Sequence, residues 1–127
     1  MLLGELVAGT PFVCGPDASL IEVAVGMASA GHGSAGVVDG RRLVGVFTER
    51  DLLRAVAQAA DLEEEPVRRW MGRDPDVFSP DVDAYDAAQW LLESGYRHLP
   101  VVGDGVLLGI VSLRGLLAAV LSSIEDE

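Results

Sequence analysis

Residues 37–56 read VVDGRRLVGVFTERDLLRAV, and residues 101–120 read VVGDGVLLGIVSLRGLLAAV. The second stretch repeats the first at an offset of 64 residues without a gap. Extended outward, the match carries Pro11–Val56 onto Pro75–Val120, and 15 of its 46 aligned positions are identical. Self-similarity at one fixed offset is the signature of a duplicated supersecondary unit. The chain is therefore a duplication, and we expect two copies of one small fold.

Each copy contains the same order of expected elements, beginning with a short extended segment, Phe12–Cys14 or Val77–Ser79. Apolar residues at helical spacing then predict a helix. Each of these helices has a polar N-cap residue before it and a glycine suited to a left-handed C-terminal position after it. These residues are Ser19 and Gly31 in the first copy, and Asp83 and Gly95 in the second.

Two β-type runs follow each of these helices, and they flank a short turn at Asp39-Gly40 or at 103–105. Such a pattern predicts a β-hairpin. A second amphipathic helix closes each copy. The fold class is therefore α/β (α+β), a β-α-β-β-α unit that occurs twice. We assign residues 1–60 to repeat 1, residues 61–66 to an exposed acidic linker, and residues 67–124 to repeat 2.

The composition excludes several classes of function. The formal net charge of −11 repels polyanions, so we expect neither nucleic acid nor an anionic membrane as a partner. Cys14 cannot form an internal disulfide and is expected to be a small apolar core residue. The chain has two histidines, which argues against a His-based metal cluster. No signal peptide or spanning segment is seen, which favours a cytoplasmic location, and no catalytic constellation converges, which favours a non-enzyme.

Thr48 and Asp51 lie where a predicted strand passes into a helix. A hydroxyl and free backbone N–H groups there can meet a phosphate or sugar oxygen, and a first-turn carboxylate can accept hydrogen bonds from a ribose diol. The same spacing is also that of an N-cap and its acidic companion, a structural role that spacing alone favours. At the equivalent positions of the second copy, Ser112 keeps the hydroxyl and Gly115 lacks the carboxylate.

A second polar group, Tyr96-Arg97-His98, precedes the first hairpin strand of the second copy. Two side chains that can carry a positive charge could hold phosphate, and the Tyr ring or the main chain could flank a base. The structural alternative is a solvated polar turn before a buried strand. The first copy has His32-Gly33-Ser34 at this place, which offers little to a phosphate.

Three segments resemble cystathionine-β-synthase-type (CBS) repeats: VRRWMGRDPDVFSPD at 67–81, VFTERDLLRAV at 46–56 and HLPVVGDGVLLGIVSLRGLLAAV at 98–120. The resemblance covers Leu3 to Val120. It implies a CBS pair, or Bateman module, in which two small sheets pack about a pseudo-two-fold axis and leave two clefts between the repeats. Such modules bind AMP, ADP, ATP, S-adenosylmethionine or related ligands, and they often pair into dimers.

The resemblance also implies roles for individual residues. Thr48 and Asp51 would hold the ribose. Residues of the same cleft would hold the other two parts of the ligand: Arg97, His98 and Arg50 the phosphate, and Gly72, Val77 and Tyr96 the base. Ser112 would belong to a second, weaker cleft, because Gly115 cannot hold a ribose through a side chain.

Two functions follow from these expectations. The first is a regulatory, signal-transducing module that binds an adenine nucleotide or S-adenosylmethionine, needs no obligatory cofactor and acts on an unknown protein effector. The alternative is a structural or partner-docking dimerisation module with vestigial clefts. Apolar residues at both ends of the chain exceed what one small core needs, so we also expect a homodimer.

Overall fold

The computed structural model of the chain describes residues 1–7 and 9–125, and it divides into two compact units. Pro11–Pro75 form one of them, called the 11–75 unit below. Met1–Thr10 and Asp76–Glu127 form the other, called the 76–127 unit.

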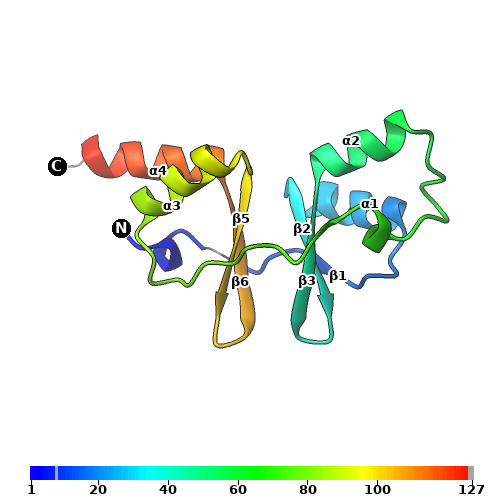
Figure 1. Cartoon of the computed structure of the whole chain (residues 1–127), viewed down its shortest axis with the longest axis horizontal. Helices are drawn as coiled ribbons and strands as arrows, with labels where there is room; N and C mark the ends of the chain where they lie inside the picture. Colours follow the sequence, from blue (N-terminus) through cyan, green and yellow to red (C-terminus); the bar gives the residue numbers. More distant parts are fainter. Residues whose placement is uncertain (8, 126–127) are drawn as a thin grey trace. The chain divides into compact units, whose positions relative to one another are not determined.

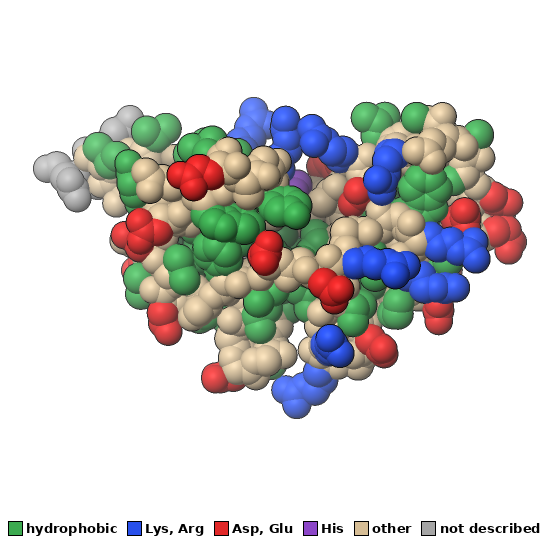
Figure 2. Space-filling model, viewed as in Figure 1, with side chains coloured by type: hydrophobic (Ala, Val, Ile, Leu, Met, Phe, Trp, Pro, Cys, Tyr) green, Lys and Arg blue, Asp and Glu red, His purple; other side chains and the backbone are tan. Residues whose placement is uncertain are grey.

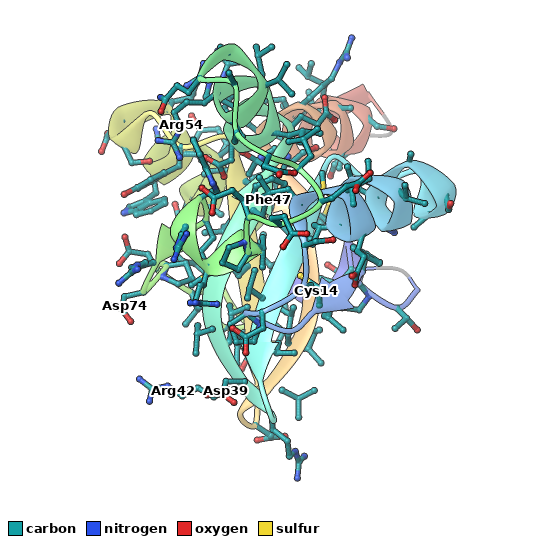
Figure 3. All side chains as sticks on the ribbon, turned by 90° about the vertical axis from the view of Figure 1, so that its right-hand side faces the viewer. Cys14, Asp39, Arg42, Phe47, Arg54 and Asp74 are labelled. Atoms are coloured by element: carbon teal, nitrogen blue, oxygen red, sulfur yellow. The ribbon has the colours of Figure 1, made fainter. Side chains whose placement is uncertain are left out.

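The 11–75 unit is a sheet with two helices against one face (Figure 1). Its strands, in spatial order, are β1 (Val13–Cys14), β2 (Ser34–Asp39), β3 (Arg42–Thr48) and β4 (Gly72–Arg73). Its helices are α1 (Leu20–Ala30), α2 (Glu49–Ala57) and the short 3-10 helix η2 (Val67–Arg69). The β1–β2 pair is parallel and the other two pairs are antiparallel. Phe47 on β3 is fully buried in the core of this unit (Figure 3).

The 76–127 unit repeats this plan with a smaller sheet (Figure 1). An antiparallel hairpin of β5 (His98–Gly103) and β6 (Val106–Ser112) is covered by α3 (Ala84–Ser94) and α4 (Leu113–Glu125), and η1 (Leu3–Glu5) completes the unit. The two hairpins even carry an irregularity at the same place, between Val37 and Val38 and between Val101 and Val102.

The helix ends confirm the predicted caps. The Ser19 hydroxyl accepts a hydrogen bond from the Glu22 N–H at 3.2 Å, and the Asp83 carboxylate accepts one from the Tyr85 N–H at 3.0 Å. At the other end of these helices, the glycines predicted to be left-handed have φ angles of 72° and 82°, at Gly31 and Gly95 respectively. Together with the two hairpins, these features confirm the predicted fold class, a mixed α/β unit that occurs twice.

One expected strand is reduced to a single bridge. In the 11–75 unit the Gly36 N–H donates to the Phe12 carbonyl at 2.9 Å, a bond that helps to hold β1 in the sheet. The residue equivalent to Gly36 in the other copy is Pro100, which has no N–H to donate. Among the described residues, the segment 77–79 therefore keeps a single parallel bridge, from Phe78 to Val101, which is held by the main-chain hydrogen bonds of Phe78 with Pro100 and Val102.

The expected exposed linker is partly fixed in place. The carbonyls of Leu62 and Glu65 accept hydrogen bonds from the N–H groups of Ile21 and Leu20, at 2.9 and 3.0 Å. These are N–H groups of the first turn of α1, which have no partner within the helix. The Leu62 side chain also packs against the core of this unit. The segment therefore caps the N-terminal end of α1 as well as joining the two repeats.

The compact units and the sequence repeats differ by two exchanged segments. Leu3 and Val67 are 64 residues apart and so occupy equivalent positions in the two repeats. Leu3 is fully buried in the core of the 76–127 unit, and Val67 is fully buried in the core of the 11–75 unit. Their N–H groups donate to equivalent carbonyls, those of Val82 and Ala18, at 2.9 and 2.8 Å. Each core therefore includes a residue supplied by the other sequence repeat.

Two equivalent glycines let these segments approach the hairpins. A Cβ atom on Gly109 would collide with the Val7 side chain. A Cβ atom on Gly45 would collide with the Met71 side chain and would lie 2.8 Å from the Gly72 carbonyl oxygen. A backbone oxygen in a paired strand cannot move away as easily as a side chain can, so Gly45 is the more constrained of the two.

We therefore expect Gly45→Ala to lower the free energy of unfolding by about 1–3 kcal/mol, the usual cost of overpacking. Gly109→Ala should cost less, because the colliding atoms there belong to a side chain and not to the backbone. Gly15→Ala is the matched control, since a Cβ atom there meets nothing within 4 Å. Urea unfolding of the three variants measures their free energies of unfolding and so tests this order of stability. Equal stability of Gly45→Ala and Gly15→Ala would contradict it.

Candidate functional site

The junction of β3 and α2 holds a closed ring of hydrogen bonds. Thr48 is the N-cap of α2, and its hydroxyl accepts from the Asp51 N–H at 3.3 Å. One oxygen of the Asp51 carboxylate, Oδ2, accepts from both the Thr48 N–H at 3.0 Å and the Thr48 hydroxyl at 3.1 Å. This reciprocal arrangement is a capping box. The structural role that the spacing favours is therefore present.

The second oxygen of that carboxylate faces an arginine. Oδ1 of Asp51 lies 3.5 Å from Nη2 of Arg54, one turn further along α2. The same guanidinium donates a hydrogen bond to the Trp70 carbonyl at 2.9 Å, and its carbon lies 5.6 Å from the centre of the Trp70 ring. The Asp51 side chain keeps 20% of its surface exposed. A polar group can therefore reach this carboxylate from solvent.

The equivalent junction in the 76–127 unit has the cap without the carboxylate. The Ser112 hydroxyl accepts from the Gly115 N–H at 3.0 Å, so the predicted hydroxyl is in place as a helix cap. A Cβ atom at Gly115 would lie 3.1 Å from that hydroxyl oxygen, closer than most such contacts. This junction can offer a ligand a hydroxyl and backbone N–H groups, but no negative charge from position 115.

The residues assigned by the resemblance fall into two groups. The 11–75 unit contains Thr48, Asp51, the exposed Arg50 on α2, and Gly72, which pairs with Val46 as β4 joins the sheet. The 76–127 unit contains the rest: Val77, Tyr96, Arg97, His98 and Ser112. The structure therefore brings together in one unit the two residues expected to hold a ribose, and the ribose role of Thr48 and Asp51, like the phosphate role of Arg97 and His98, stays a prediction.

Tyr96 and its neighbours are supported by packing within the 76–127 unit. The Tyr96 ring is stacked on Trp90, with ring centres 5.9 Å apart, and more than half of it is exposed. The Arg97 carbonyl accepts from the Leu113 N–H at 2.8 Å, which ties this segment to the start of α4. His98 begins β5 and is half-buried. An exposed aromatic face beside an arginine can pack against a flat ligand.

An open pocket of about 390 Å³ lies on the 11–75 unit beside Arg54. Its walls come from α2 and its C-cap residue, from the linker, and from η2 and the residue after it: Arg54, Gln58, Glu65, Arg69 and Trp70. Arg69 is paired with Glu65 at 2.8 Å. In the view of Figure 2, several arginine side chains lie on the surface of the 11–75 unit. The chain's basic residues are all arginine, although its net charge is strongly negative.

Other reactive groups form no second centre in the part of the chain that the structure describes. Burial raises the pKa of the Cys14 thiol to about 11, so it is protonated and poorly nucleophilic near neutral pH. Among the described residues, no group of three or more His, Cys, Asp or Glu side chains could hold a metal ion. None of the helices within residues 1–7 and 9–125 is long and apolar enough to cross a membrane.

Sequence reasoning missed the Arg54–Trp70 contact. The spacing of Asp51 and Arg54 along a helix was visible, but the partner on the far side of the guanidinium is a main-chain carbonyl 16 residues away. No pattern of side chains in the sequence predicts a main-chain partner of this kind. The indole N–H of Trp70 is buried and has no hydrogen-bond partner among the described residues, and this feature likewise has no sequence signature.

Comparison with known families gives one match that occurs twice. The CBS domain family matches residues 3–58 and 67–122 of this chain. These two ranges differ by the same 64-residue offset and include the exchanged segments η1 and η2, each at the start of a repeat.

Individual relatives agree with this match. An uncharacterized 17.7 kDa protein of Acidianus ambivalens is 38% identical over 112 residues, covering 87% of this chain and 67% of that protein. The solved structure of a CBS domain protein from Pyrobaculum aerophilum complexed with AMP is 29% identical, with a TM-score of 0.86 and full coverage of both chains. The CBS domain pair of protein MJ0100, in complex with 5′-methylthioadenosine and S-adenosyl-L-methionine, shares the fold with a TM-score of 0.86 at 21% identity, over 97% of this chain and 98% of that one.

Proposed function

Because the chain belongs to the CBS domain family, we propose that it is a regulatory module that binds an adenosine-containing ligand through Thr48 and Asp51. The observation that supports this most is the partly exposed Asp51 carboxylate at the start of α2. A regulatory role means that the bound ligand changes the activity of a partner protein, and it requires no chemistry at the site itself.

The Asp51 carboxylate has spare capacity for a ribose. An ionised carboxylate offers about four lone-pair positions. Oδ2 uses two of them for Thr48, whereas within the described part of the chain Oδ1 has only the ion pair with Arg54, at 3.5 Å. A ribose hydroxyl can therefore donate to Oδ1 while the capping box stays intact. The structural role and the ligand role of Asp51 are thus compatible rather than exclusive.

AMP is the first ligand to test. The Pyrobaculum aerophilum protein, similar over its full length, was solved with AMP. ADP, ATP and S-adenosylmethionine share the adenosine part and would use the same ribose contact. The phosphate contacts expected at Arg97, His98 and Arg50, and the base contacts at Gly72, Val77 and Tyr96, remain part of this proposal.

We expect millimolar AMP to raise the melting temperature of the protein. At one hundred times the dissociation constant, the linkage gain is roughly 2.7 kcal/mol, which corresponds to several degrees for a chain of this size. Asp51→Asn keeps an oxygen that can cap the helix but removes the charge, so AMP affinity should fall about ten- to a hundredfold. Differential scanning fluorimetry and calorimetry measure the two effects.

Ser112→Ala is the matched control, because it alters the equivalent junction that lacks a carboxylate. It should cost about 0.5–2 kcal/mol of stability through the lost cap and leave AMP affinity unchanged. If AMP, ADP, ATP and S-adenosylmethionine all leave the parent's melting curve unmoved, the ligand-sensing proposal fails. The partner-docking function then replaces it.

A second copy of the chain is the partner that we propose for its exposed apolar residues. Leu53 and Val56 on α2, and Leu121 and Ile124 on α4, each expose more than half of their surface. Apolar exposure of this kind on both closing helices is typical of a two-fold interface. This proposal concerns assembly and holds for either function, sensing or docking.

Light scattering should therefore return twice the 13.4 kDa mass of the chain at tens of micromolar. Leu121→Glu places a charge on an exposed apolar helix position, so it should shift the particle to the monomer mass without unfolding it. Val106→Glu, at the start of β6 and 39% exposed, is the control and should remain dimeric. A parent protein that is monomeric at that concentration would rule out the dimer.

A further inference from the structure

Arg54 connects the candidate ribose carboxylate to a distant segment of the 11–75 unit. Its guanidinium lies 3.5 Å from Oδ1 of Asp51 and donates to the Trp70 carbonyl at 2.9 Å. It also lies over the Trp70 ring, 5.6 Å from the ring centre, which is within the range of a cation–π contact. Arg54 is labelled in Figure 3, at the upper left of the view.

Asp51, Arg54 and Trp70 are all replaced by other residue types at the equivalent positions of the other copy. At the 64-residue offset, Asp51 corresponds to Gly115, Arg54 to Ala118 and Trp70 to Leu6. The positions around them remain alike: Leu52, Leu53, Ala55 and Val56 are identical to their counterparts. The helix core has therefore been kept in both copies, while the carboxylate, the arginine and the tryptophan occur only as a set.

Trp70 and its counterpart Leu6 both pack against the core of their unit, but the fold itself requires neither the carboxylate nor the arginine. The copy with Gly115, Ala118 and Leu6 forms the same helix, with its cap and buried Leu116 in place. The Arg54 side chain is 53% exposed, and an exposed ion pair contributes little to stability. The arginine instead limits the orientation of the Asp51 carboxylate, because it contacts Oδ1 while Thr48 holds Oδ2.

We propose that Arg54, held by Trp70, is a positioning residue that orients the Asp51 carboxylate for the ribose diol of the ligand. This inference rests on the proposed adenosine-binding function. A restrained carboxylate loses less freedom when the diol binds, so more of the interaction appears as affinity. Arginine suits this task because its planar group can stack on the indole and still present N–H donors at its edge.

The same contacts connect the Asp51 carboxylate to the segment after Trp70. Trp70 immediately precedes Met71 and β4, and β4 pairs with β3, whose last residue is Thr48. A ligand that binds Oδ1 of Asp51 would therefore alter the contact of Oδ1 with Arg54. Through the hydrogen bond from Arg54 to the Trp70 carbonyl, it would also act on the main chain just before this strand. The positioning residue thereby joins the ribose contact to the segment in which Gly72 is expected to meet the base.

A double-mutant cycle tests the positioning role directly. The parent, Asp51→Asn, Arg54→Met and the double variant are titrated by calorimetry with AMP and with 2′-deoxyadenosine monophosphate, which lacks one of the two ribose hydroxyls. Arg54→Met should weaken AMP about three- to tenfold in the parent and less than about twofold in the Asp51→Asn background, as expected for residues that act as a unit. With the deoxy ligand, the loss caused by Arg54→Met should shrink in the same way.

Two controls separate positioning from general effects of charge or stability. Arg41→Met removes the same charge from an exposed position in the turn between β2 and β3, and it should change AMP affinity less than about twofold. Arg54→Lys restores the charge but not the planar stacking group, and it should recover only part of the affinity. Melting curves of all variants without ligand report any loss of folding separately.

The outcomes are distinct. If the parent binds AMP and Arg54→Met costs the same factor with and without Asp51, or with both ligands, Arg54 does not act through the carboxylate and the inference is wrong. An unchanged affinity in Arg54→Met overturns it equally. If the parent itself does not bind AMP or another adenosyl compound, the proposed function fails first and the inference falls with it.

Discussion

The burial of Leu3 and Val67 is the constraint on which the rest of the structure depends. Each residue fills the core of one unit, yet each comes from the opposite sequence repeat. Equivalent backbone hydrogen bonds fix both segments, and Gly45 and Gly109 leave room for them against the hairpins. A repeat of about 60 residues cannot bury enough apolar surface alone to be robust. Because of this exchange, each unit needs a residue of the opposite repeat to complete its core. The segment that enters the 11–75 unit also carries Trp70.

Much of the fold could be predicted from the sequence because it is encoded locally and twice. Caps, left-handed glycines and hairpin turns depend on neighbouring residues, and the duplication allowed each to be read in two versions. The exchange could not be predicted, since nothing in the order of elements tells which core Leu3 or Val67 enters. The loss of a strand at 77–79 was predictable in principle, because Pro100 lacks the N–H that Gly36 donates. Its effect depends on a pairing that only the structure shows.

The candidate site was predicted in part for the same reason. Thr48 and Asp51 form a local motif, and the structure shows them hydrogen-bonded to each other at the start of α2. The contact of Arg54 with a main-chain carbonyl has no sequence signature, and the residues of the 76–127 unit were assigned by family resemblance alone. The two copies have kept their cores and differ in their polar groups. Each unit needs its own packed core to fold, whereas a single carboxylate is enough for a single bound ligand.

The central claim is that one copy of the duplicated junction binds ligand and the other only caps a helix. The most direct measurement is the stoichiometry of AMP binding by isothermal titration calorimetry, with the protein concentration set well above the dissociation constant. The account predicts one AMP per chain, and none of comparable affinity in Asp51→Asn. Two equivalent AMP molecules per chain would contradict it, because Gly115 would then bind as well as Asp51 does.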